Sequence, residues 1–177
     1  MQFETTGIQG LIIITPKVFG DNRGAFYEAY NQKVFSQNGI DIKFVQDNQS
    51  VSSYGVIRGL HFQNPPFAQK KLVRVVVGRI LDVAVDIRQG SPTYGKHFSI
   101  ELSAENRKQL LIPHGFAHGF SVLSETAEVI YKCDNFYNKE SEGGIIYNDP
   151  LLNIDWQIPA GKEIVSEKDL MLRAFRG

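Results

Sequence analysis

The stretch RGLHFQ at residues 58–63 sets a histidine, His61, between two apolar residues and three positions after Arg58. An imidazole has an ordinary pKa of about 6.5, so it can accept and return a proton near neutral pH. A histidine in apolar company is often only a core residue with a single hydrogen-bond partner. Its value as a candidate base therefore depends on the other acid–base groups that accompany it.

A histidine base needs an acidic partner that fixes its tautomer and stabilises the imidazolium form. The sequence offers Asp82, Asp86 and Asp169, and spacing along the chain does not choose among them. Asp169 has a competing explanation, because Ser166 and Asp169 are spaced like the capping box at the start of a helix. All three aspartates remain candidates at this point.

Tyr131 and Lys71 are two further groups that could move or stabilise charge. Tyr131 lies in VIYKC on the same strand face as Val129 and Cys133, where a core tyrosine with a satisfied hydroxyl is an alternative. Lys71 begins an alternating run with Val73, so its amine shares a face with apolar side chains. It must either face a polar cavity or lie at the solvent end of the strand.

Cations and amides suited to a phosphorylated ligand occur in two other segments. Arg23 lies in the predicted turn DNRG and Arg58 precedes His61, and guanidinium groups bind phosphate oxygens in pairs. Arg23 could equally be a solvated loop residue. Gln46, Asp47 and Asn48 in VQDNQS carry amide and carboxylate groups suited to sugar hydroxyls or a base edge.

Metal ligands are few. The chain has four histidines, and a catalytic metal site commonly needs about three protein ligands. His114 and His118 are four residues apart in IPHGFAHGF, but Pro113, Gly115 and Gly119 argue against the helix that would align them. We therefore expect no metal centre.

The elements that must hold these residues are mostly strands. Residues 79–90, 96–102 and 127–133 alternate apolar and polar side chains with a period of two, which predicts strands with one apolar face. Gly, Pro and Asn turns divide these runs, as in a sandwich, jelly roll or barrel. Short helices are predicted at 31–40, ended by Asn38–Gly39, and at 166–175, with Ser166 as N-cap.

Composition limits the classes of protein. Nineteen basic and nineteen acidic side chains cancel over 177 residues, so a nucleic-acid or membrane surface is not expected. The single cysteine, Cys133, excludes an intrachain disulfide and a CxxC metal site. No targeting segment or domain boundary is visible, so we expect one domain over 1–177 and a cytoplasmic location.

Several segments, read in order, resemble the dTDP-4-dehydrorhamnose 3,5-epimerase family. They include FGDNRGAFYE, FVQDNQS, GVIRGLHFQ, LLIPHGFAHGF, VIYKC, EGGIIYNDP and SEKD, and they run from about residue 19 to residue 169. Tyr147 stands where tryptophan is frequent, and Phe136 with Tyr137 where two tyrosines are common. The resemblance implies a mainly β, RmlC-like cupin jelly-roll barrel with a few short helices. It also implies a homodimer that uses a dTDP-sugar without metal or organic cofactor.

The resemblance also implies roles for individual residues. His61 would be the proton acceptor, Asp169 its dyad partner and Tyr131 the proton donor. Lys71 would be a substrate contact, and from the chemistry of a cation beside a ketone we expect it to stabilise the enolate that forms when the neighbouring carbon loses its proton. The remaining substrate contacts would be Arg23, Glu28, Gln46, Asp47, Asn48, Arg58, His118, Tyr137, Glu142 and Lys168.

The implied reaction inverts C3 and C5 of dTDP-4-keto-6-deoxyglucose and gives dTDP-4-dehydro-L-rhamnose for dTDP-L-rhamnose biosynthesis. The nearest alternative is an epimerase that inverts only C3 or only C5, because the same base and enolate serve both reactions. A 3,4-ketoisomerase, a metal-dependent cupin oxygenase and a sugar-binding barrel without catalytic activity are further alternatives.

Overall fold

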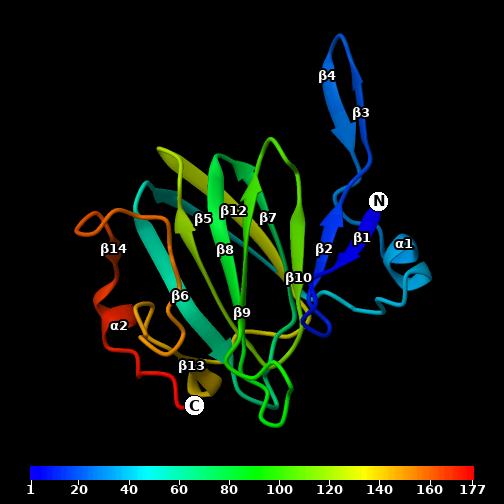
Figure 1. Ribbon diagram of the computed structural model, residues 1–177. Coiled ribbons are helices and arrows are strands. Elements are labelled where there is room, and N and C mark those ends of the chain that lie inside the picture. Colours follow the sequence, from blue (N-terminus) through cyan, green and yellow to red (C-terminus); the bar gives the residue numbers. More distant parts are fainter.

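Two β-sheets face each other in the computed structural model, which describes all residues 1–177 (Figure 1). The first sheet is antiparallel and has the order β1-β2-β10-β7-β12-β5. Its strands in chain order are β1 (Gln2–Thr5), β2 (Ile12–Thr15), β5 (Gln46–Ser53), β7 (Lys71–Val77), β10 (Gln109–Ile112) and β12 (Thr126–Cys133).

The second sheet has the order β13-β6-β11-β8-β9, and a short parallel strand, β14, also pairs with β6. Its strands are β6 (Val56–Gln63), β8 (Arg79–Asp86), β9 (His97–Ser103), β11 (Phe116–Val122), β13 (Glu142–Gly144) and β14 (Ile164–Val165). Consecutive strands often lie in opposite sheets, so each half of the chain contributes to both walls. The arrangement is a jelly-roll barrel.

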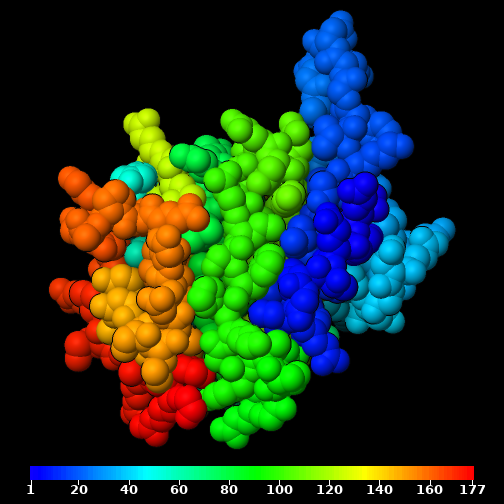
Figure 2. Space-filling view, in the orientation of Figure 1, coloured from blue at the N-terminus to red at the C-terminus, as the bar shows by residue number.

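A separate hairpin, β3 (Val18–Asp21) and β4 (Gly24–Tyr27), stands away from the two sheets (Figures 1 and 2). Its aromatic residues Phe19 and Phe26 are 55% and 69% exposed. Helix is limited to α1 (Gln32–Gln37), α2 (Glu167–Leu170) and the 3-10 turn η1 (Lys139–Ser141). The tip of the hairpin projects beyond the rest of the chain (Figure 1), and its exposed apolar side chains face solvent.

The main core lies between the sheets, and a second apolar cluster lies outside the second sheet, under the C-terminal segment. A third cluster packs α1, through Phe35, against the outer face of the first sheet. This arrangement explains a departure from the sequence-based expectation for residues 79–90, because both faces of β8 are buried. The apolar face of that strand packs outward against Leu152 and Trp156, and the face that carries Asp82 points into the barrel.

Helix α1 confirms the prediction for 31–40, with Asn31 as its N-cap. The prediction for 166–175 is correct at its start but too long, because α2 ends at Leu170. Beyond it, Arg173 bridges Ile145 in an extended conformation and Phe175 donates its backbone N–H to Asp149. These contacts with the body of the protein outweigh continuation of the helix.

Candidate active site

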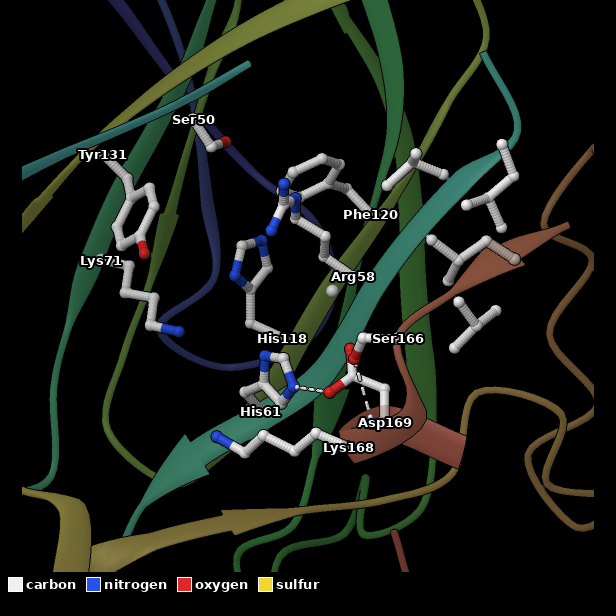
Figure 3. Close-up of a pocket in the computed structure, with 15 residues that line it drawn as sticks. Ser50, Arg58, His61, Lys71, His118, Phe120, Tyr131, Ser166, Lys168 and Asp169 are labelled. Carbon is white, nitrogen blue, oxygen red and sulfur yellow. Dashed lines mark hydrogen bonds and ion pairs between the residues drawn. The ribbon is translucent and has the colours of Figure 1, made fainter. Parts of the chain in front are cut away.

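A cavity of about 490 Å³ opens between the two sheets and is lined by polar side chains from β5, β6, β7, β11, β12 and α2. A second cavity of about 330 Å³ adjoins it, and His61, Lys71 and Tyr131 line both. The two cavities therefore form an inner and an outer lobe that meet at these three residues. Figure 3 shows the inner lobe, with Tyr131 and Lys71 across from His61 and His118.

His61 pairs with Asp169, which settles which of the three candidate aspartates is its partner. The Nε2 of His61 lies 2.8 Å from Oδ1 of Asp169 (Figure 3), and the backbone N–H of Gly59 donates to Oδ2. Burial by itself raises the pKa of Asp169, but the hydrogen bonds from His61 and Gly59 outweigh it and hold this pKa below its ordinary value. The carboxylate is thus ionised at neutral pH and able to stabilise an imidazolium.

Asp169 is only half of the predicted capping box. Its backbone N–H donates to Oγ of Ser166, as the motif requires, but its side chain reaches to His61 instead of returning to Ser166. The helix cap therefore orients the residue and leaves its carboxylate free for the site. Asp86, in contrast, accepts hydrogen bonds from Arg88, Ser91 and Thr93 within its own turn.

The two histidines of the site lie side by side because β6 and β11 approach closely, with His61 opposite His118 in the register. Gly59 makes this approach possible. A Cβ atom there would lie 2.5 Å from Cα of Gly119, and its φ of +128° is a conformation that other residues rarely adopt.

Lys71 faces the cavity, as one of its two sequence-based alternatives requires, and its ammonium lies 5.7 Å from the ring centre of Tyr131. Removal from water lowers the pKa of Lys71. Burial raises the pKa of Tyr131, so the phenol keeps its proton well into the alkaline range. The wall of the cavity opposite His61 thus offers a proton donor and a lysine amine.

An ion pair between Glu142, which lines the outer lobe, and Lys168, which lines the inner lobe, lies beside the cavities. Lys168 lies 2.7 Å from both carboxylate oxygens of Glu142, which also accepts a hydrogen bond from the Tyr137 hydroxyl at 3.3 Å. The bond from Lys168 is the main reason that the pKa of Glu142 is lowered. Gln46 and Asn48 line the outer lobe, where Tyr137 is 56% exposed.

Arg58 lines the inner lobe and donates from Nε to Oγ of Ser52 at 3.0 Å. Three predicted substrate contacts lie elsewhere in this chain. Asp47 points outward and pairs with Lys132, Glu28 accepts a hydrogen bond from Asn31, and Arg23 pairs with Asp21 at the tip of the hairpin. The side chain of Arg23 is 85% exposed.

Ser50 and Phe120 also line the inner lobe and were not among the site residues predicted from the sequence. The period of two along β5 contained the signal for Ser50, because Gln46, Asn48 and Ser50 share one face of the strand and Asp47 takes the other. The structure contains no group of three or more His, Cys, Asp or Glu side chains that could hold a metal ion. No helix is long and apolar enough to cross a membrane.

A His–Asp pair, a partly buried phenol and a lysine amine around one cavity define an acid–base site for a small molecule in a jelly-roll barrel. Residues 5–176 match the family described as dTDP-4-dehydrorhamnose 3,5-epimerase. A relative of that name from Shigella flexneri is 55% identical over 171 residues, which span 96% of this chain and 93% of the relative.

Comparison with solved structures points to the same family. The dTDP-4-dehydrorhamnose 3,5-epimerase from Elizabethkingia anophelis is 56% identical, with a TM-score of 0.94 over 99% of this chain and 96% of that one. The dTDP-6-deoxy-D-glucose-3,5-epimerase RmlC from Legionella pneumophila, in complex with dTDP-4-keto-L-rhamnose, is 48% identical, with a TM-score of 0.93 over 98% and 92%. The chain belongs to the dTDP-4-dehydrorhamnose 3,5-epimerase family, and the fold class expected from the sequence motifs is confirmed.

Proposed function

We propose that this protein inverts C3 and C5 of dTDP-4-keto-6-deoxyglucose to give dTDP-4-dehydro-L-rhamnose. The observation that carries the proposal is the His61–Asp169 pair, which faces the Tyr131 hydroxyl across the cavity, with Lys71 beside them. The names of the relatives support the substrate. The product would serve dTDP-L-rhamnose biosynthesis.

The chemistry follows from the C4 ketone, which flanks both C3 and C5. A C–H bond beside a ketone loses its proton because the resulting charge delocalises onto the carbonyl oxygen as an enolate. His61 would remove the proton, and Asp169 would stabilise the imidazolium. Tyr131 would return a proton to the opposite face of the carbon, which inverts the centre. No redox change occurs.

Lys71 would stabilise the enolate. A cation fixed in a cavity with little water interacts strongly with the oxygen on which negative charge develops. The ammonium is already in place beside Tyr131, so little reorganisation is needed when the charge forms. The same cation could act during both inversions, because both use the C4 oxygen.

The nucleotide would occupy the outer lobe and its margin. Tyr137 offers an exposed aromatic face for a base, and Gln46 and Asn48 offer amide groups beside it. Arg58 and His118 line the inner lobe with His61. Binding energy from the nucleotide would then position the sugar ring against the acid–base groups.

We further propose that two copies of the chain assemble and that each hairpin completes the site of its partner. Arg23 and Glu28 lie outside the cavity of their own chain, and the hairpin that carries Arg23 projects into solvent with Phe19 and Phe26 exposed (Figure 2). Exposed aromatic residues around an arginine suit an interface that also binds phosphate. We also infer one domain over residues 1–177 and a cytoplasmic location.

The test is a coupled assay. The purified protein is incubated with dTDP-4-keto-6-deoxyglucose and a rhamnose-forming reductase, and the products are separated. The proposal predicts dTDP-L-rhamnose that requires both proteins. If the product is a 6-deoxysugar inverted only at C3 or only at C5, the protein is a single-centre epimerase. A substrate that binds and stays unchanged would contradict the enzymatic proposal.

A further inference from the structure

Asp82 is a buried acid for which the proposed reaction has no direct use. It lies in the middle of β8 with no exposed surface, and its Oδ1 lies 2.8 Å from Nε2 of His118. Its second carboxylate oxygen, Oδ2, is buried without a hydrogen-bond partner. An unsatisfied buried polar atom of this kind destabilises the fold, so its presence calls for a compensating interaction.

A candidate for that interaction, Lys71, lies in the opposite sheet. The face of β8 that carries Asp82 and the face of β7 that carries Lys71 both border the core between the sheets. The charge of Asp82 acts on Lys71 and favours its protonated form. Lys71 itself has no ion pair and no hydrogen bond from its ammonium, only the ring of Tyr131 nearby.

Two carboxylates, Asp82 and Glu142, favour the protonated form of Lys71, and of these only Asp82 has no cation as a partner. The Glu142 carboxylate is occupied by Lys168, and burial raises the pKa of Cys133 to about 11, so that thiol is neutral. Burial lowers the pKa of His118, which is therefore neutral at pH 7 and does not balance Asp82. The titratable groups that face Lys71 are His61 on β6, Asp82 on β8, His118 on β11, Tyr131 and Cys133 on β12, and Glu142 on β13.

We propose that Asp82 is a positioning residue that keeps Lys71 cationic in the cavity and holds His118 in a single tautomer. As an acceptor from Nε2–H, the carboxylate leaves Nδ1 of neutral His118 without a proton. One negative and one positive charge then balance across the barrel before the substrate binds. The contribution to catalysis rests on the proposed function, whereas the coupling between Asp82 and Lys71 does not.

The test reads the charge of Lys71 directly. Protein labelled with ¹³C at lysine Cε is titrated by NMR, and Lys71→Arg identifies the signal. In the wild-type protein Lys71 remains charged at pH 7. In Asp82→Asn, which keeps the shape and the acceptor for His118, the pKa of Lys71 falls by about one unit or more. Asp82→Glu, which keeps the charge, moves it back toward the wild-type value.

Asp149→Asn is the matched control, because Asp149 is also buried but does not line either lobe, and it should leave the titration of Lys71 unchanged. A neutral Lys71 at pH 7 in the wild-type protein would overturn the proposal without any variant. So would an unchanged titration in a folded Asp82→Asn protein.

A measurement of turnover distinguishes a failure of this inference from a failure of the proposed function. With Asp82→Asn we expect turnover to fall by up to about tenfold at pH values near and above the pKa of Lys71, because a shift of one unit lowers the cationic fraction of Lys71 by at most a factor of about ten. A shifted titration with wild-type turnover would support the coupling of Asp82 to Lys71 and contradict the role of Lys71 in the reaction.

Discussion

His61 and Asp169 meet although 108 residues separate them in sequence. The contact depends on β14, which pairs in parallel with β6 and delivers α2 to the end of the strand that carries His61. The carboxylate has two partners, the imidazole and the N–H of Gly59, so its position is fixed before any substrate arrives. Because the carboxylate holds the His61 ring in one orientation, the imidazole is already positioned to act as a base when the substrate binds.

Tyr131→Phe should separate removal of a proton from its return. Without the hydroxyl, His61 can still exchange the C–H proton with solvent, but the opposite face of the carbon lacks its donor. We expect epimerised product to fall by about a hundredfold or more while solvent exchange falls much less. NMR of the sugar in deuterated water measures both rates in one sample. Equal losses would mean that Tyr131 is structural or acts in the first step.

The lowered pKa of Asp169 predicts a pH dependence of stability. An acid whose folded pKa lies below its unfolded value stabilises the fold above about pH 4, and this stabilisation disappears as the pH falls through the folded pKa. Asp169→Asn should therefore lower the free energy of unfolding by about 1–2 kcal/mol at pH 7. The difference from wild type should shrink below pH 4. Urea unfolding of both proteins at pH 7 and pH 3 measures this difference in the free energy of unfolding. An equal difference at the two pH values would contradict a lowered pKa of Asp169 in the folded protein.

At the scale of the elements, the site depends on the close approach of β6 and β11. Gly59→Ala would place a methyl group against Gly119 and the carbonyl oxygen of His118. The control is Gly24→Ala in the hairpin, where φ is also +128° but no atom lies within 4 Å of the added carbon. We expect Gly59→Ala to cost about 1–3 kcal/mol more than this control, since only the first creates a clash.

Thermal and urea unfolding of the two glycine variants give the comparison. Gly59→Ala should also lose activity, because the separation of His61 from His118 changes. Equal destabilisation by the two substitutions would mean that backbone conformation alone accounts for the glycine at 59.

The sequence allowed β7, β8, β9, β12 and the cap of α2 to be predicted, because alternation and capping are local patterns. It did not reveal that β8 is buried on both faces, since the cover over Leu81 and Val83 comes from residues 145–158, far along the chain. For the same reason, spacing alone left Asp82, Asp86 and Asp169 as equal candidates for the partner of His61. Their different partners are set by tertiary contacts.

At the scale of the whole molecule, the exposed hairpin gives the dimer proposal a sharp test. Arg23→Ala and His61→Ala proteins should each have little activity. If each hairpin completes the partner's site, mixing and exchanging the two variants creates hybrid dimers with one intact site. About a quarter of the wild-type activity should then return, because half of the dimers are hybrids and half of their sites are intact. No recovery after verified exchange of subunits would mean that Arg23 does not act across the interface.

The central claim, that one acid–base site acts at both carbons beside the ketone, is tested most directly by solvent deuterium. The wild-type protein and His61→Ala are incubated with dTDP-4-keto-6-deoxyglucose in deuterated water, and C3 and C5 are followed by NMR. We predict deuterium at both carbons with the wild-type protein, and at least about a hundredfold slower incorporation at both with His61→Ala. Deuterium at one carbon only, or incorporation at either carbon that survives the loss of His61, would contradict the account.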